Sequence, residues 1–246
     1  MACKIQFCFK RYEKKYMLTP DQLARMLAGI NGHMRADEFG RYTICNIYYD
    51  TDDFQLIRAS LEKPVYKEKL RMRSYGVPGS RDEVFVELKK KYDSVVYKRR
   101  TVMNAADAVS YIHDGAVPKR EDQICREIDW FMRSYHPKPK VFIAYDRTAF
   151  AGLDNPDLRL TFDTNLRWRD RDLDLRAGDY GEPLLASDQI LMEIKIPGTT
   201  PVWLAHLLSE IGAFPTSFSK YGTCYTQNIL SGRRAEPAGR EVRPCA

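Results

Sequence analysis

Cationic side chains stand at every second position in the stretch EKLRMRSY, residues 68–75. Successive side chains of a strand point to opposite faces, so Lys69, Arg71 and Arg73 share one face. Two like charges about 4 Å apart repel by roughly 4 kcal/mol at an effective dielectric constant near 20. Such a row is stabilised by a bound anion, and the forked guanidinium groups fit the oxygens of a phosphate.

The same alternation recurs in the other strand-like segments. Charged faces are formed by Arg11, Glu13 and Lys15, by Glu87, Lys89 and Lys91, by Lys98 and Arg100, by Tyr145 and Arg147, by Arg159 and Asp163, and by Glu193 and Lys195. For any single strand, an ordinary solvated sheet face is the simpler interpretation. Over all of these strands, however, cations greatly outnumber acids, and this imbalance predicts a bound polyanion.

The elements that would position these side chains indicate an α+β fold. Helical spacing predicts helices at about 20–31, 52–61, 105–114, 120–135 and 201–211, with Thr19 and Thr200 as N-caps of the first and the last. Between them lie strand-like segments such as YTICNIYYD, DEVFVELKKKY and KVFIAYDRTAF. The turn sequences VPGS and KYDS favour antiparallel connections between consecutive strands.

If these strands close with their charged faces inward, they form an antiparallel β-barrel of about eight strands with a cationic interior. The predicted helices then cover the apolar outer face. We expect a single domain over residues 1–230 and a disordered tail over 231–246, which is small, polar and charged.

Composition narrows the function class. The net charge of +6 over 246 residues favours an acidic partner. The six cysteines form no C-x-x-C pair, and the sequence contains neither a signal-peptide pattern nor a long apolar run, so we expect a cytoplasmic protein without a membrane span. The P-loop pattern is absent, and the four histidines lack the spacing of zinc ligands.

A series of short motifs resembles the VTC (vacuolar transporter chaperone) domain of the CYTH-like triphosphate tunnel metalloenzyme superfamily. The motifs are R-Y-E-K-K-Y at 11–16, K-L-R-M-R-S-Y-G at 69–76, E-L-K-K-K-Y at 87–92, V-Y-K-R-R at 96–100, Y-D-R-T-A-F at 145–150, L-T-F-D-T-N-L at 160–166, M-E-I-K at 192–195 and F-S-K-Y at 218–221. The resemblance implies a β tunnel and, in catalytic members, a polymerase that transfers the terminal phosphate of ATP to inorganic polyphosphate. No SPX regulatory domain is recognisable, so we expect a stand-alone, bacterial-type member, with any membrane protein as a separate partner.

The resemblance also implies roles for individual residues. The family's phosphate-binding positions are occupied by Lys15, Arg71, Arg73, Lys89, Lys98, Arg147 and Lys220. Within the matching motifs, further tunnel-lining residues are Lys69, Arg100, Tyr145 and Arg159. Glu193 falls at the metal-ligand position, and carboxylate and phosphate oxygens suit Mn²⁺ or Mg²⁺.

Our hypothesis for the reaction assigns catalytic roles to Arg71, Arg73, Arg147, Lys220 and Glu193. Glu193 holds a metal that bridges two phosphates of ATP, while Arg147 and Lys220 stabilise charge on the transferred group. Alternatives stay open for the acids. Glu193 can instead be an internal partner of Lys195 or Arg73, and Asp163 can either orient an arginine or close a turn.

The first strand departs from the wider superfamily. Related CYTH triphosphatases carry E-x-E-x-K, where this chain has Arg11-x-Glu13-x-Lys15. Losing one carboxylate weakens the case for activating water and favours a polymerase over a hydrolase. A metal-dependent triphosphatase and a non-catalytic polyphosphate-binding module remain as alternatives. Nucleic acid is not expected, because Tyr12, Tyr16 and Tyr75 do not predict a stacking platform on the cationic face.

Overall fold

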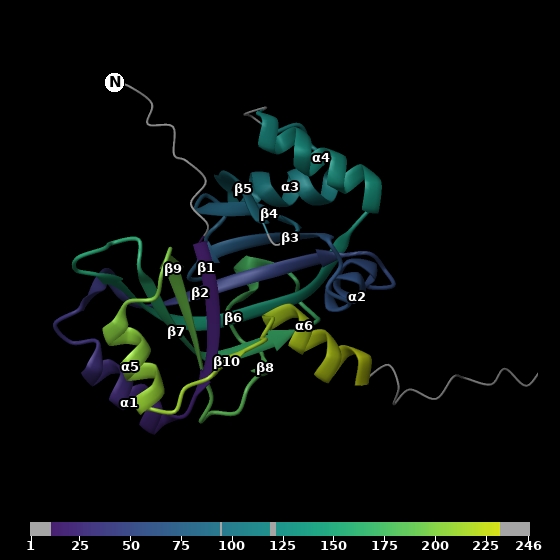
Figure 1. The fold of residues 1–246 in the computed structure, drawn as a ribbon. Coiled ribbons are helices and arrows are strands. Elements are labelled where there is room, and N and C mark those ends of the chain that lie inside the picture. Colours follow the sequence, from purple (N-terminus) through teal and green to yellow (C-terminus); the bar gives the residue numbers. More distant parts are fainter. Residues whose placement is uncertain (1–10, 94, 119–121, 232–246) are drawn as a thin grey trace, which may run out of the picture.

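A computed structural model of the protein describes residues 11–93, 95–118 and 122–231. They form one ten-stranded sheet with helices packed on it (Figure 1). The strands are β1 (Arg11–Leu18), β2 (Met34–Asp50), β3 (Tyr66–Tyr75), β4 (Glu83–Tyr92), β5 (Val95–Asn104), β6 (Lys138–Gly152), β7 (Arg159–Arg169), β8 (Glu182–Pro183), β9 (Ile190–Pro197) and β10 (Pro215–Thr216). The α-helices are α1 (Pro20–Gly29), α2 (Gln55–Leu61), α3 (Ala105–Asp114), α4 (Gln123–Tyr135), α5 (Val202–Glu210) and α6 (Lys220–Cys224). A 3-10 turn, η1 (Leu175–Ala177), and a π-helical turn, η2 (Tyr225–Ile229), complete the list.

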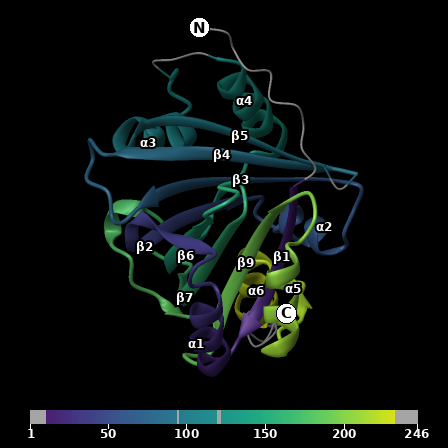
Figure 2. The ribbon, with the colours of Figure 1, turned by 60° about the vertical axis from the view of Figure 1, so that its left-hand side comes forward.

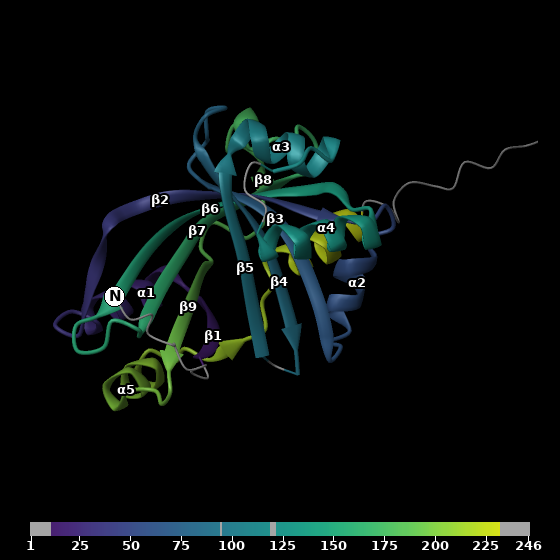
Figure 3. The same ribbon diagram turned by 90° about the horizontal axis from the view of Figure 1, so that it is seen from above.

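All strand pairings are antiparallel, in the order β10-β1-β9-β7-β6-β2-β3-β4-β5, with β8 beside β7. The sheet bends between β2 and β3, so that β3, β4 and β5 lie across the other strands (Figures 2 and 3). We call the inner side of this bend, which carries the cationic side chains of β3 to β5, the concave face. The antiparallel α+β architecture predicted from the sequence is confirmed.

The expected barrel differs from the observed sheet in one respect. Among the described residues, no pairing joins β5 to β1 or β10, so the hydrogen-bonded ladder is open. The count of about eight strands fits the longer elements, since β8 and β10 have only two residues each. The edge strand β5 pairs with β4 alone, and the cationic face is therefore enclosed by bending rather than by ladder closure.

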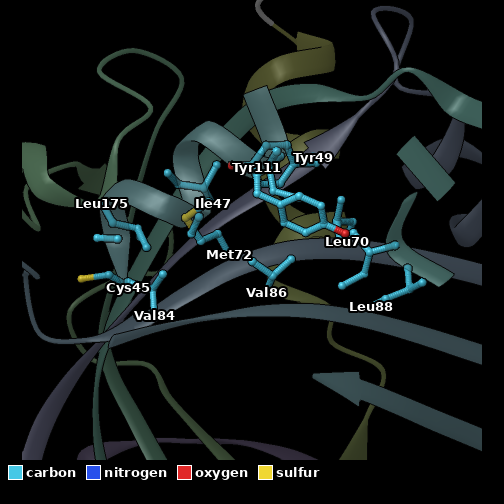
Figure 4. Close-up of a cluster of buried hydrophobic side chains, with 14 of the residues drawn as sticks. Cys45, Ile47, Tyr49, Leu70, Met72, Val84, Val86, Leu88, Tyr111 and Leu175 are labelled. Atoms are coloured by element: carbon cyan, nitrogen blue, oxygen red, sulfur yellow. The ribbon is translucent and has the colours of Figure 1, made fainter. Parts of the chain in front are cut away.

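The outer face of β3 and β4 packs under α3 and α4. Figure 4 shows this cluster, which contains Cys45, Ile47, Tyr49, Leu70, Met72, Val84, Val86, Leu88, Tyr111 and Leu175. The helices begin where the sequence supplies N-caps: the side chain of Asn104 accepts from the amide of Asp107, and that of Asp122 accepts from the amide of Cys125. Burial of the apolar faces thus forces the alternating cations of β3 and β4 to the concave face.

A second apolar cluster covers the outer face of β1, β7 and β9 with α1 and α5. Thr19 caps α1 through a capping box with Gln22, as predicted. The predicted cap at Thr200 is wrong, because α5 begins after Pro201 without a side-chain hydrogen bond. Helix α1 approaches α5 closely at Gly29, where an added Cβ would lie 2.4 Å from a methyl carbon of Leu207.

Helix α6 was not predicted, and it packs on the concave face. Its Tyr221 ring stacks on Tyr48 of β2 at 4.9 Å between centroids. The Tyr221 hydroxyl donates to Asp50 at 2.9 Å, and Asp50 also accepts from the amides of Leu56 and Ile57 at the start of α2. This network fixes the position of the neighbouring residue, Lys220.

Two expectations concern the ends of the chain and its relation to membranes. Of the predicted tail, residues 232–246 lie outside the described residues. Within the described part of the chain, none of the helices has the length and apolar character needed to cross a membrane.

Candidate anion-binding site

Glu87 of β4 is the centre of the first charged cluster. Its side chain is 1% exposed, and its carboxylate accepts a hydrogen bond from Arg71 Nε at 2.7 Å. Lys98 Nζ lies 2.7 Å from the carboxylate, while Arg73 Nε and Arg100 Nη1 lie at 3.7 and 3.9 Å. The register causes this arrangement, because β3 and β5 place Arg71 and Arg100 opposite Glu87. One carboxylate faces four cations, so the cluster keeps a net positive charge.

The guanidinium groups of this cluster are held by β2. Arg73 Nε donates to Asn46 Oδ1 at 2.9 Å, and the Asn46 amide in turn donates to the carbonyl of Ile143 at 3.0 Å. Arg71 Nη1 donates to the hydroxyl of Tyr48 at 3.3 Å. These neutral partners fix the arginines without cancelling their charge. The arginines are therefore preorganised for an anion.

A second cluster is built on Asp163 of β7, which is fully buried. It accepts two hydrogen bonds from Arg147 of β6, at 2.6 and 2.8 Å, and one from Lys220 Nζ at 2.6 Å. Burial alone would raise the pKa of Asp163, but Lys220 and Arg147 lower it to about 2. Of the two alternatives for Asp163, the orientation of an arginine is confirmed.

Tyr145 connects the two clusters. Its hydroxyl accepts from Arg73 Nη2 at 3.4 Å, while Lys220 Nζ and Arg147 Cζ lie 4.2 and 5.2 Å from its ring centroid. Burial would raise the pKa of Tyr145, yet Arg73, Arg147 and Lys220 hold it below its ordinary value. The cations of both clusters therefore act together around one buried tyrosine.

Glu193 of β9 makes a longer ion-pair contact than Glu87 and Asp163 do. It lies opposite Lys15 of β1, and its Oε1 is 3.8 Å from Lys195 Nζ. Burial would raise its pKa, but Lys15 and Lys195 lower it, so the carboxylate is ionised. This long contact with Lys195 supports the alternative in which Glu193 is an internal partner of a lysine.

Among the described residues, no group of three or more His, Cys, Asp or Glu side chains is arranged to hold a metal ion. Glu193 offers one hard carboxylate ligand, which fits Mn²⁺ or Mg²⁺ only if phosphate oxygens and water complete the coordination.

The remaining predicted residues occupy two other parts of the concave face. Lys69 and Lys98 both lie opposite Lys89, so the three side chains form a lysine row across β3, β4 and β5. Lys69 Nζ donates to Ser219 Oγ at 3.4 Å, and Lys15 Nζ donates to the carbonyl of Phe218 at 2.9 Å. Arg159 is exposed at the start of β7, opposite Lys195, and is not brought into either cluster.

Sequence reasoning missed the residues that anchor the cations. Glu87 was placed on the charged face without a role in the site, although it is the sole acid in the run ELKKKY. The available signal was its spacing of two residues from Lys89, which places both side chains on the same face of the strand. Asn46 and Tyr48 gave no signal, because their contacts with Arg73 and Arg71 depend on the register between β2 and β3.

Comparisons with known proteins identify the family and the fold. A family model described as the VTC domain matches residues 10–229. Vacuolar transporter chaperone complex subunit 4 of Schizosaccharomyces pombe is 28% identical, over 87% of this chain and 36% of that protein. The subunit of the same name from Trypanosoma brucei brucei is 27% identical, over 62% of this chain and 24% of that protein. The chain thus spans 36% and 24% of the lengths of these two curated relatives.

Solved structures show the same fold at low identity. A putative adenylate cyclase from Bacillus halodurans has a TM-score of 0.52 at 15% identity, covering 84% of this chain and 92% of that one. A putative adenylyl cyclase from Hippeastrum, described as having a dominant triphosphatase activity, has a TM-score of 0.51 at 15% identity, covering 87% and 94% of the two chains. At this identity the likeness concerns the fold alone.

The Glu87 cluster generates a prediction about stability. Glu87→Gln leaves Arg71, Arg73 and Lys98 without their counter-ion, and loss of one partner of a buried pair costs about 3 kcal/mol or more. We expect the free energy of unfolding, measured by urea denaturation, to fall by that amount. Adding tripolyphosphate should then raise the free energy of unfolding of this variant more than it raises that of wild type. Glu127→Gln, which breaks pairs with Lys90 and Arg99 outside the concave face, is the control. Equal recovery by both variants contradicts the assignment.

Lys69 generates a prediction about protons. Burial, together with the positive charges of Lys67, Lys89 and Lys15, lowers the pKa of Lys69 to about 7 against the opposing effect of Asp50. The charge is thus present below that pKa and lost as pH rises through it. Because a polyanion favours the charged form, wild type should take up a proton when it binds tripolyphosphate just above pH 7.

Lys69→Arg, which stays charged, should lose this uptake. Calorimetry in buffers of different ionisation enthalpy measures the number of protons that each protein takes up. Any change in the protonation of tripolyphosphate itself is the same for both proteins and cancels in the comparison. The same uptake in both would show that Lys69 does not meet the anion.

Proposed function

The chain belongs to the VTC domain family, and on that premise we propose that it is an ATP–polyphosphate phosphotransferase. The terminal phosphate of ATP is transferred to the end of an inorganic polyphosphate chain that lies on the concave face. The observation that carries the proposal is the arrangement of Arg147 and Lys220 on Asp163, with Arg73 beside them across Tyr145. Fixed cations of this kind can contact both phosphate groups that meet during transfer.

Phosphoryl transfer depends mainly on positioning and charge stabilisation. The bond between the bridging oxygen and the terminal phosphorus of ATP breaks, and the bridging oxygen leaves with ADP and keeps the electron pair. A terminal oxygen of polyphosphate forms the new bond. Arg147 and Lys220 stabilise negative charge on the transferred group. Because Asp163 already holds both side chains in position, they need not reorganise during the reaction. Arg71 and Arg73 hold the adjoining phosphates as bidentate donors.

The ionisation of Glu87 and Asp163 favours phosphate over water as the acceptor. A water molecule needs a general base, whereas a terminal phosphate oxygen is already ionised. Burial alone would raise the pKa values of Glu87 and Asp163. The surrounding cations outweigh this effect and lower both values to about 2, so both carboxylates are poor bases. This supports the interpretation drawn from the first strand, where a basic residue stands at one acidic position of the hydrolases.

Glu193 is the residue that would hold Mn²⁺ or Mg²⁺, together with phosphate oxygens of the substrate. A bound divalent ion supplies neutralisation of charge on the donor phosphates. Lys15, opposite Glu193 on β1, and Lys195, two residues along β9, keep the carboxylate of Glu193 ionised and thus ready to bind a cation.

A triphosphatase is the second candidate. The observation that favours it is the 3.8 Å contact between Glu193 and Lys195, which leaves this carboxylate less committed than Glu87 or Asp163 and able to orient water. A non-catalytic module would use the same cations to bind polyphosphate without turnover. The same experiment separates all three.

Purified protein is incubated with ATP and Mn²⁺, with and without a polyphosphate primer, and long polyphosphate and free phosphate are measured separately. We expect long polyphosphate. Orthophosphate alone identifies a triphosphatase, and binding without either product identifies a binding module.

The same assay tests the named residues. Lys220→Met should lower kcat roughly 100-fold or more, the usual effect of losing one donor that stabilises transition-state charge. Lys138→Met, which loses an exposed pair with Asp52, should leave kcat unchanged. Unfolding curves of both variants establish that Lys220→Met is still folded. Wild-type kcat in folded Lys220→Met contradicts the role of Lys220.

A further inference from the structure

Four aromatic rings form a row beside the two charged clusters. Phe39 and Tyr42 of β2 have ring centroids 6.2 Å apart, Tyr42 and Tyr75 of β3 are 5.9 Å apart, and Tyr75 and Phe85 of β4 are 5.6 Å apart. All three contacts are edge-to-face. The row therefore crosses three strands at one end of the concave face, and it includes Tyr75, for which the sequence predicted no stacking platform.

The row is only partly covered by protein. Phe39 is 69% exposed and Tyr75 is 52% exposed, whereas Tyr48 and Tyr145 elsewhere on this face are buried. Edge-to-face packing that served the core alone would leave less ring surface in water. The row thus offers open aromatic surface to a ligand.

The position of the row relates it to the phosphate-binding cations. Phe85 lies directly opposite Arg73, and Tyr42 lies opposite Arg147. Tyr75 is two residues from Arg73 on the same face, about 7 Å along the strand. The guanidinium of Arg100 lies 4.1 Å over the ring of Phe85. A ligand whose phosphates contact Arg73 and Arg147 would place an attached group against these rings.

We propose that this row is a nucleobase-binding subsite, in which the base of the nucleoside triphosphate donor stacks on Tyr75 and Phe39. The inference rests on the proposed function and adds to it the site of donor recognition. A polyphosphate chain has no apolar or aromatic part and gains nothing from the row. A nucleobase has a π-face and stacks on aromatic side chains or arginine.

The opposite end of the concave face supports this assignment by contrast. There β3, β4 and β5 place Lys69, Lys89 and Lys98 opposite one another, and this row contains no aromatic ring. Such a row suits the uniform charge of polyphosphate. The two ends therefore differ in chemistry: the aromatic end takes the nucleotide, and the lysine end takes the acceptor chain.

Binding of ATP and of inorganic tripolyphosphate, each measured by calorimetry without divalent metal, tests the subsite. Tyr75→Leu should weaken ATP binding about tenfold, within the range for one lost base–aromatic stack, and change tripolyphosphate binding less than twofold. Phe39→Leu, at a more exposed position, should act in the same direction and guards against misfolding of the first variant. Tyr75→Trp should retain ATP binding. Tyr92→Leu, an exposed tyrosine outside the row, is the matched control.

Each outcome bears on a separate claim. Selective loss of ATP affinity supports the subsite. Unchanged ATP affinity in Tyr75→Leu and Phe39→Leu, or an equal loss for both ligands, overturns the subsite and leaves the proposed function standing. Wild-type protein that binds neither ligand overturns the proposed function as well.

Discussion

A surplus of fixed positive charge on the concave face is the constraint on which the rest of the structure depends. Glu87 faces four cations, and Asp163 is shared by Arg147 and Lys220. Like charges at such separations repel by several kcal/mol at protein dielectric values. The fold tolerates this because each cation is tied to a strand and the apolar outer faces are buried under helices. The buried acids thus hold the cations in place without neutralising the face, which leaves it suited to a multiply charged anion.

The same constraint bears on chemistry. An acid that is surrounded by cations is a poor base, and Glu87 and Asp163 are both in that state. Groups that arrive already ionised, such as phosphate oxygens, need no deprotonation there. The face is also asymmetric along its length, with aromatic rings at one end and lysines at the other. A transferase with a donor and an acceptor requires such a difference, whereas a simple phosphate-binding surface does not.

Much of this arrangement could be predicted from alternation and capping alone. Period two placed Lys69, Arg71 and Arg73 on one face, and helical spacing located five helices, one of them, α3, with the predicted bounds. Other features depend on which strands become neighbours, and this information is not local in sequence. The contact of Arg73 with Asn46 and the aromatic row around Tyr75 both arise from the register of β2, β3 and β4. The open edge at β5 and the placement of α6 on the concave face likewise depend on tertiary contacts, which local sequence patterns do not specify.

A crystal structure of the protein with tripolyphosphate and Mn²⁺ tests the central claim most directly. The account predicts phosphate oxygens within hydrogen-bond distance of Arg73, Arg147 and Lys220, with the metal on Glu193 and on phosphate oxygens. Tripolyphosphate bound on the outer surface, with no phosphate bound on the concave face, would contradict the account.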